Sequence, residues 1–176
     1  MKWVAVSGSW KYNFPLLRKD IEREIAGLLD HGCGIVSGGA PGVDYWATEV
    51  ALKMYPDGSR IRVYIPTPLD VYIENVRDVE PNDPGISSET FLCLIEQLLR
   101  LKALGALTEN DKEKKVDTES YHKRNLMVVK NSDSLIAFHV NNSGGVLNTI
   151  EHARSLNMKV TVFNYTRQNA SPDDYV

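Results

Sequence analysis

Short apolar runs alternate with amphipathic stretches along most of the chain. The runs at 3–6, 33–36 and 61–65 are rich in β-branched residues and end at glycine, serine or proline, so they predict strands. Between these runs, apolar residues recur every three or four positions at 16–29 and 43–54, which predicts helices. Strands that alternate with helices at this spacing predict right-handed crossovers and a parallel sheet.

Local signals mark the ends of the first helix. Asn13 is expected to cap its N-terminus, Pro15 fits its first turn, and Gly32 is a suitable stop at its C-terminal end.

The segment at about 66–117 interrupts this alternation. Four prolines between 66 and 84 predict irregular backbone through most of its first half. Ser87 or Ser88 then caps a leucine-rich helix that continues through Leu104. This helix is apolar over more than half of its circumference, and two interpretations stay open: contact with a second copy, or burial within its own domain. The charged run at 109–115 is most simply a solvated loop.

The alternation resumes after residue 117. Asp117 or Thr118 caps a helix that runs to about Lys130, and strands at 135–138 and 160–163 flank a helix at 146–156. The pattern predicts an α/β fold: a Rossmann-like three-layer domain with a mostly parallel sheet and helices on both faces. We expect a single domain over residues 1–176, with an insertion at about 66–117.

Composition sets limits on function. The chain is 43% hydrophobic, enough for a full core, and its net charge of −3 does not favour an extended basic surface for duplex nucleic acid. No apolar run reaches the roughly 20 residues of a membrane span, and the run at 3–6 is too short for a signal peptide. Cys33 and Cys93 lie in apolar stretches and are interpreted as small buried residues. They show no zinc-site spacing with the histidines. We expect a cytoplasmic protein without a metal site or membrane contact.

Three segments rich in glycine and serine, at 7–9, 37–42 and 143–145, each follow a strand and lead into a helix. Parallel strands end at one edge of their sheet, so these loops should meet there. A helix N-terminus presents unpaired amides and the positive end of a dipole, and glycine lets a ligand approach that backbone. The loops therefore predict a phosphate site. The absence of Gly-x-Gly-x-x-Gly and of a Walker motif disfavours dinucleotide redox chemistry and ATP hydrolysis.

The same loops carry a family resemblance. The segments at 4–9 and 34–44, with Ala47 and Ala51, resemble the core of the DNA-processing protein A family. Arg124-Asn125, then 134–138 and 143–145, with Thr149 and Ala153, look like its later motifs. They are similar too to the wider SLOG superfamily, which also holds the LOG phosphoribohydrolases and the molybdenum-cofactor carrier proteins. The resemblance implies a Rossmann-like fold, a nucleotide-derived or nucleic-acid ligand, and frequent homodimers.

The loops and the resemblance together give the candidate ligand-binding residues: Gly8, Ser9, Ser37, Gly38, Gly39, Gly42, Asp44, Arg124, Asn125, Ser143, Gly144, Gly145 and Thr149. Asp44 is either an acidic residue that the helix dipole favours in the first turn or the acceptor of a hydrogen bond from a ribose hydroxyl. Arg124 forms a surface salt bridge or, as we favour, binds two phosphate oxygens at once. Asn125 could bond a base edge or cap the loop below it.

Several positions depart from the family patterns. Trp10 stands where the first family motif often has arginine, so one expected cation is missing. In the LOG pattern His152 occupies the glutamate position and Glu151 lies one residue earlier, which disfavours hydrolysis; the candidate catalytic residues are Arg124, Glu151 and Asp44. We expect His122 to be a surface residue, and Trp10 and Tyr12 to pack on the core rather than stack on a base.

These observations predict that the protein binds a nucleotide or nucleotide-derived phosphate ligand, with no other cofactor implied. The expected partners are this small molecule and a second copy of the chain in a homo-oligomer. The first alternative is a phosphoribohydrolase acting on nucleoside 5′-monophosphates. The second is single-stranded DNA binding, which the acidic composition disfavours.

Overall fold

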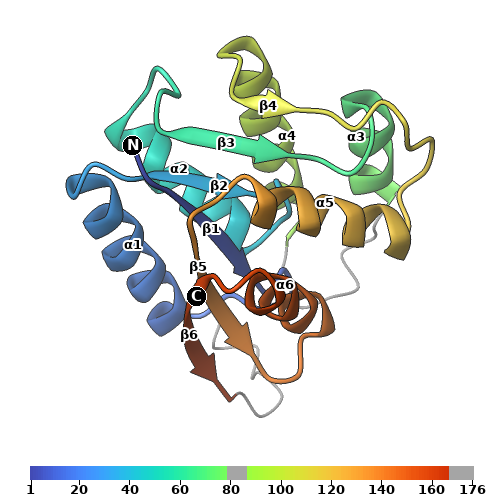
Figure 1. Cartoon of the computed structure of the whole chain (residues 1–176). Helices are drawn as coiled ribbons and strands as arrows, with labels where there is room; N and C mark the ends of the chain where they lie inside the picture. The colour runs from blue at the N-terminus through green and yellow to red at the C-terminus, as the bar shows by residue number, and fades with distance from the viewer. Residues whose placement is uncertain (79–86, 167–176) are drawn as a thin grey trace.

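The computed structural model describes residues 1–78 and 87–166 and shows helices on both faces of a parallel sheet (Figure 1). The six strands within these residues run in the spatial order β4-β3-β2-β1-β5-β6, and every pairing between neighbours is parallel. The predicted α/β architecture is therefore confirmed, with a sheet that is parallel throughout. The strands are β1 (Trp3–Gly8), β2 (Gly34–Ser37), β3 (Ile61–Tyr64), β4 (Leu107–Thr108), β5 (Ser134–Val140) and β6 (Lys159–Tyr165).

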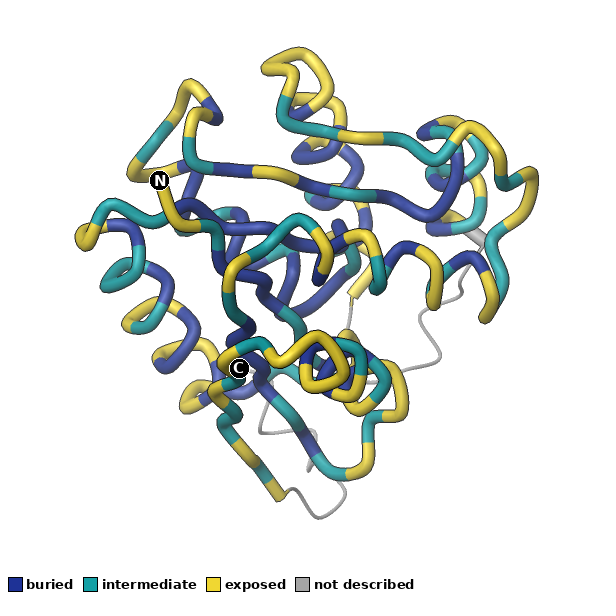
Figure 2. Tube along the Cα trace, in the orientation of Figure 1, coloured by how far each residue is buried: buried dark blue, intermediate teal, exposed yellow. Residues whose placement is uncertain are grey.

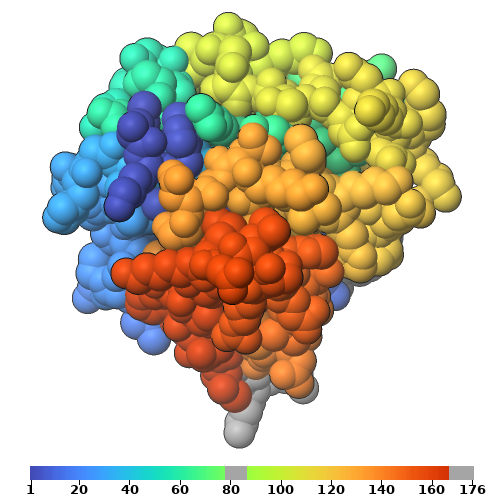
Figure 3. All heavy atoms as spheres, viewed as in Figure 1, coloured from blue at the N-terminus to red at the C-terminus, as the bar shows by residue number. Residues whose placement is uncertain are grey.

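Two clusters of buried residues, one on each face of the sheet, hold the layers together. Figure 2 shows that the central strands β1 and β2 are largely buried. The larger cluster joins the sheet to α1, α2, α3 and α4, and the smaller one joins it to α5 and α6. In the space-filling view, side chains of α5 and α6 cover the centre of the front face (Figure 3). The helices are α1 (Pro15–Asp30), α2 (Val43–Met54), α3 (Leu69–Asp78), α4 (Ser88–Ala103), α5 (Thr118–Lys130) and α6 (Gly144–Ser155).

Helix α1 shows how the apolar spacing builds the core. Leu17, Ile21, Ile25 and Leu29 are at most 1% exposed, and burial of each such side chain contributes about 1.5–3 kcal/mol. Pro15 lies in the first turn as predicted, but the predicted cap is wrong, because Phe14 is the N-cap residue and no side chain caps the helix. The ring of Phe14 is buried and packs edge-on against Tyr165, so aromatic packing fixes the start of this helix.

The segment at 66–117 holds more regular structure than its prolines predict. Helix α3 follows directly after Pro68, whose carbonyl accepts the first helical hydrogen bond from the amide of Tyr72. Proline is compatible with this position because the first helical amides need no partner within the helix. The prediction of irregular backbone is therefore wrong for 69–78, and Pro81 and Pro84 lie outside the described residues. The two-residue strand β4 was too short to produce a sequence pattern.

Helix α4 begins at the predicted cap, since Ser87 accepts a hydrogen bond from the amide of Thr90. One face of the helix is buried in the larger cluster, whereas Leu92 and Leu99 are exposed. Burial within its own fold thus accounts for one face, and contact with a second copy stays a prediction. Cys33 and Cys93 are half-buried free thiols, so the expectation of full burial is wrong.

The order of the strands fixes where a site can form. The chain runs outward from β1 through β2 and β3 to β4, and then returns to place β5 on the other side of β1. The connections that leave β1 and β5 therefore diverge to opposite sides, which creates a crevice at the carboxyl ends of these strands. No helix among the described residues is long and apolar enough to cross a bilayer.

Candidate functional site

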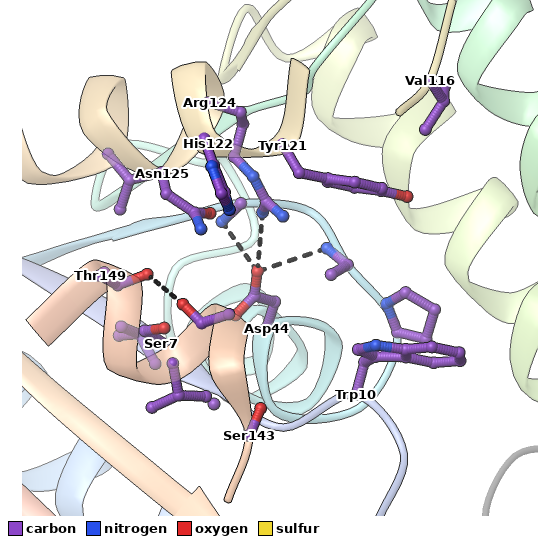
Figure 4. Close-up of a pocket in the computed structure, with 18 of the residues that line it drawn as sticks. Ser7, Trp10, Asp44, Val116, Tyr121, His122, Arg124, Asn125, Ser143 and Thr149 are labelled. Atoms are coloured by element: carbon purple, nitrogen blue, oxygen red, sulfur yellow. Dashed lines mark hydrogen bonds and ion pairs between the residues drawn. The ribbon is translucent and has the colours of Figure 1, made fainter. Parts of the chain in front are cut away.

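A cavity of about 480 Å³ lies at this edge of the sheet (Figure 4). Its wall is formed by the segments that follow β1, β2 and β5 and by residues of α3, α4 and α5. A volume of this size suits a small organic ligand, for which sites of about 300–1,000 Å³ are usual. Eight of the predicted ligand-binding residues lie on the wall: Gly8, Gly38, Asp44, Arg124, Asn125, Ser143, Gly145 and Thr149.

The other predicted residues do not line this cavity; they are Ser9, Ser37, Gly39, Gly42, Gly144 and the catalytic candidate Glu151. The hydroxyl of Ser37 is fully buried and pairs with Thr48. Gly39 has a φ of +62° and faces the core, where an added Cβ would lie within 3.1 Å of Val63 and two other apolar side chains. Ser37 and Gly39 therefore shape the loop after β2 rather than the wall of the cavity.

The carboxylate of Asp44 folds back over the loop that precedes it. Its Oδ2 atom accepts hydrogen bonds from the amides of Gly38, at 3.0 Å, and Ala40, at 3.4 Å. The sequence predicted that these amides would receive a phosphate, but an internal carboxylate already occupies them. The expectation of an open anion site is therefore wrong for this loop.

Arg124 reaches the same carboxylate from α5. Its Nη1 atom lies 3.2 Å from Oδ2 of Asp44, and the two side chains are 8% and 7% exposed, so this is a buried pair rather than a surface salt bridge. Burial raises the pKa of Asp44, and the guanidinium and the two amides offset this effect only in part. Within the described residues, the Nε atom of Arg124 is buried without a hydrogen-bond partner.

Gly38 leaves the space that the guanidinium fills. A Cβ atom built on Gly38 would lie 1.2 Å from Nη1 of Arg124 and 2.8 Å from Oδ2 of Asp44. Any side chain at this position would displace the arginine. The glycine is therefore required by a close approach of α5 to the loop, which its place in a glycine-rich run did not reveal.

One whole face of α5 lies along the cavity. Thr118, Tyr121, His122, Asn125 and Val128 recur at helical spacing on its wall, together with Arg124. His122 is an exposed residue, as predicted, and its side chain also points into the cavity (Figure 4). The signal that could have found this face is the helical spacing of polar and aromatic residues after Asp117.

The N-terminus of α6 contributes the remaining open amides. Ser143 is its N-cap residue in an extended conformation, and no side chain caps the first turn. The amides of Gly145 and Val146 lie in that turn, where they have no acceptor within the helix, and both residues line the cavity. The hydroxyl of Thr149 donates to the carbonyl of Gly145 at 3.0 Å, so its own bond is satisfied within the helix. This end of the cavity favours negative charge.

No protein-family model matches the sequence, and a search of curated proteins finds no match. Among solved structures, the chain is similar to DNA processing protein A from Helicobacter pylori, studied for its single-stranded DNA binding mode. The identity is 23% and the TM-score 0.68, over 97% of this chain and 68% of that chain.

DNA processing protein A from Streptococcus pneumoniae is similar at 19% identity and a TM-score of 0.51, over 92% of this chain and 58% of that one. The protein TM1055 is similar at 17% identity and a TM-score of 0.53, over 91% and 72%. The chain has the fold of DNA processing protein A. The resemblance to DNA processing protein A is thus confirmed at the level of the fold.

Two aromatic residues, Trp10 and Tyr12, follow β1 and differ in how they pack. Tyr12 packs against the larger core cluster as predicted, and its hydroxyl accepts a hydrogen bond from the Asn141 amide at 3.0 Å. Trp10 is 36% exposed and lines the cavity, so the prediction that it packs on the core is wrong. Within residues 1–78 and 87–166, no three histidine, cysteine or acidic side chains gather as a metal site would require.

Proposed function

We propose that the protein binds a nucleotide-type ligand in this cavity, with a phosphate at the N-terminus of α6. The observation that carries the proposal is that the unpaired amides of Gly145 and Val146 share one cavity wall with the buried guanidinium of Arg124. Only Nη1 of Arg124 is taken by Asp44, so the rest of the guanidinium has donors for phosphate oxygens. A ligand phosphate would meet a helix dipole and a cation together.

Asp44 limits how many anionic groups the cavity can accept. Its carboxylate occupies the amides of the loop after β2, which would otherwise form a second anion site. The amides of Gly38 and Ala40 and the guanidinium of Arg124 all donate to Oδ2, and Oδ1 has no hydrogen bond to another described residue. We infer that Oδ1 accepts from a neutral donor, such as a ribose hydroxyl, and that the site prefers a monophosphate to a polyphosphate.

The hydrolase alternative has less support. Breaking an N-glycosidic bond would require a free acid or base beside the ligand. Glu151 is exposed and does not line the cavity. Asp44 is the only carboxylate on the wall among the described residues, and it is held by Arg124 and two amides. A binding function without catalysis fits this arrangement better.

Single-stranded DNA is the second candidate ligand. It is favoured by the likeness to DNA processing protein A from Helicobacter pylori, which extends over 97% of this chain. The charged pair on the cavity wall is internally neutral and the chain has a net charge of −3, so few phosphates would find a cation. Binding of this kind should weaken steeply with added salt, whereas capture of a single phosphate should depend on salt only weakly.

Thermal shift and titration calorimetry test the proposal. Nucleoside 5′-monophosphates should raise the melting temperature, since a ligand at 100 times its Kd stabilises a folded protein by about 2.7 kcal/mol. Gly145→Gln fills space at the wall and should abolish the shift. Gly144→Gln is the matched control, because it adds the same side chain one position away, at a residue off the wall.

The proposal fails if no monophosphate stabilises the wild-type chain, or if Gly145→Gln binds as tightly as Gly144→Gln. Binding of a single-stranded oligonucleotide, with a steep dependence on salt and no response to monophosphates, would support the second candidate instead.

A further inference from the structure

The part of the cavity away from the glycine loops has a different character. We propose that it receives the aromatic base of the ligand, and that Asn75 recognises the polar edge of this base. This inference rests on the proposed function and extends it from the phosphate to the base. The compartment, called the base compartment below, is lined by Trp10, Tyr72, Val76, Phe91, Val116 and Tyr121.

The segment at 66–117 builds most of this compartment. It supplies Tyr72, Asn75 and Val76 from α3, Phe91 from α4 and Val116 from the connection to α5. Positions 72, 75 and 76 lie on one face of α3, because residues three and four apart are neighbours on a helix. The insertion therefore has a place at the site: it closes the cavity with apolar and aromatic surface beyond the loops.

Contacts to the rest of the fold hold α3 in position. The buried hydroxyl of Tyr72 donates to the carbonyl of Gly39, at 3.1 Å, in the loop after β2. The carboxylate of Glu109 accepts from the amide of Leu69 at 2.7 Å and pairs with Lys102 of α4 at 2.6 Å. Since Leu69 and Tyr72 in the first turn of α3 are held in this way, the helix presents Asn75 from a fixed element, as specific recognition requires.

Asn75 is the polar residue that α3 contributes to the cavity. Its side chain is half-buried, and its amide makes no hydrogen bond to any other residue that the structure describes. An amide offers donors beside an acceptor, which matches a base edge carrying a donor next to an acceptor. A ligand without such an edge would leave this amide unpaired in an apolar environment, which disfavours its binding.

The aromatic side chains give the base a surface. Figure 4 shows Trp10 and Tyr121 on the side of Asp44 where Val116 lies, whereas Ser7 and Thr149 lie on the other side. A ligand could therefore place its phosphate at α6, its sugar beside Asp44 and its base in the base compartment. Stacking on aromatic rings stabilises any aromatic base, and Asn75 adds recognition of its polar edge.

Titration calorimetry of the full chain tests this assignment. The probes are the four common ribonucleoside 5′-monophosphates and ribose 5-phosphate, which has the same phosphate and sugar but no base. At least one monophosphate should bind at least about tenfold more tightly than ribose 5-phosphate, a difference of about 1.4 kcal/mol. Asn75→Leu should weaken that monophosphate about tenfold and leave ribose 5-phosphate unchanged.

Glu74→Leu is the matched control, since it adds the same side chain at the neighbouring exposed position of α3. Asn75→Ala adds no bulk and should show the same loss, so a failure of Asn75→Leu to fold does not end the test. Equal affinity for ribose 5-phosphate and all four monophosphates would overturn the base compartment and leave the phosphate site standing. Unchanged affinities in both Asn75 variants would overturn the role of Asn75. No binding of any probe would overturn the proposed function together with this inference.

Discussion

The Nη1 atom of Arg124 lies 3.2 Å from the Oδ2 atom of Asp44, although 80 positions separate these residues in the chain. The pair joins α5 to the first turn of α2 at the wall of the cavity, and both side chains are almost fully buried. Removing one member of a buried pair leaves the other charge without a partner, which costs much more than the pair itself contributes.

Replacement of Arg124 should therefore destabilise the fold strongly. We expect Arg124→Met to lower the free energy of unfolding by about 3–5 kcal/mol, because Asp44 would stay buried and unpaired. Asp44→Asn in the same chain should recover part of this loss, and urea denaturation of the two single variants and the double variant measures it. Strictly additive effects would contradict the coupling. Lys123→Ala removes surface ion pairs of the same helix and should leave the urea midpoint nearly unchanged.

A methyl group at Gly38 should act through the same pair. The Cβ of Gly38→Ala would lie 1.2 Å from Nη1 of Arg124, so the guanidinium must leave Asp44. We expect a large fall in melting temperature, comparable with that of Arg124→Met, and a loss of ligand affinity. Gly144→Ala is the control, because an added Cβ there meets no atom within 4 Å. A Gly38→Ala variant as stable as this control would show that Arg124 can move without cost.

Features encoded by neighbouring residues were predictable from the sequence. Apolar spacing defined α1 and α2, and small residues after β1, β2 and β5 placed three loops at one sheet edge. Gly8, Gly38 and Gly145 line a common cavity, as the parallel arrangement of the strands implies.

Features that depend on distant residues were not predictable. Asp44 accepts the amides of its own loop only because it is buried there, beside an arginine from a helix much later in the chain. Helix α3 depends in part on Glu109, whose carboxylate accepts the amide of Leu69 from 40 positions away. In the sequence, Glu109 belongs to a charged run that is typical of a solvated loop. No local pattern distinguishes a carboxylate that caps a distant helix from one that faces water.

The link between Glu109 and α3 should make stability depend on pH. Burial acts to raise the pKa of Glu109, but hydrogen bonds from Lys102 and from the amide of Leu69 outweigh it and lower the pKa. A folded pKa below the unfolded value of about 4.3 gives stabilisation that is present above that pH and is lost as pH falls through the folded pKa. The stability difference between wild type and Glu109→Gln should therefore be largest at neutral pH and vanish in acid.

Urea denaturation between neutral pH and about pH 3 measures this difference, in a range chosen to pass the ordinary glutamate pKa of about 4.3. Glu74→Gln changes an exposed side chain of the same helix and should leave the urea midpoint unchanged throughout. A difference between wild type and Glu109→Gln that persists undiminished at the acid end would show that the carboxylate charge has no part in holding α3.

The first turn of α5, which begins the polar face of the cavity, depends on a reciprocal cap. The Asp117 side chain accepts from the amide of Ser120 at 2.9 Å, and the Ser120 hydroxyl accepts from the amide of Asp117 at 2.9 Å. Asp117→Ala should lower the melting temperature by about 3 °C, because it leaves the Ser120 amide without its partner. Asp117→Asn keeps an acceptor of the same shape and should retain most of the stability. Hydrogen exchange of the first-turn amides should accelerate in Asp117→Ala alone; equal acceleration in both variants would assign the effect to the lost charge and not to the cap.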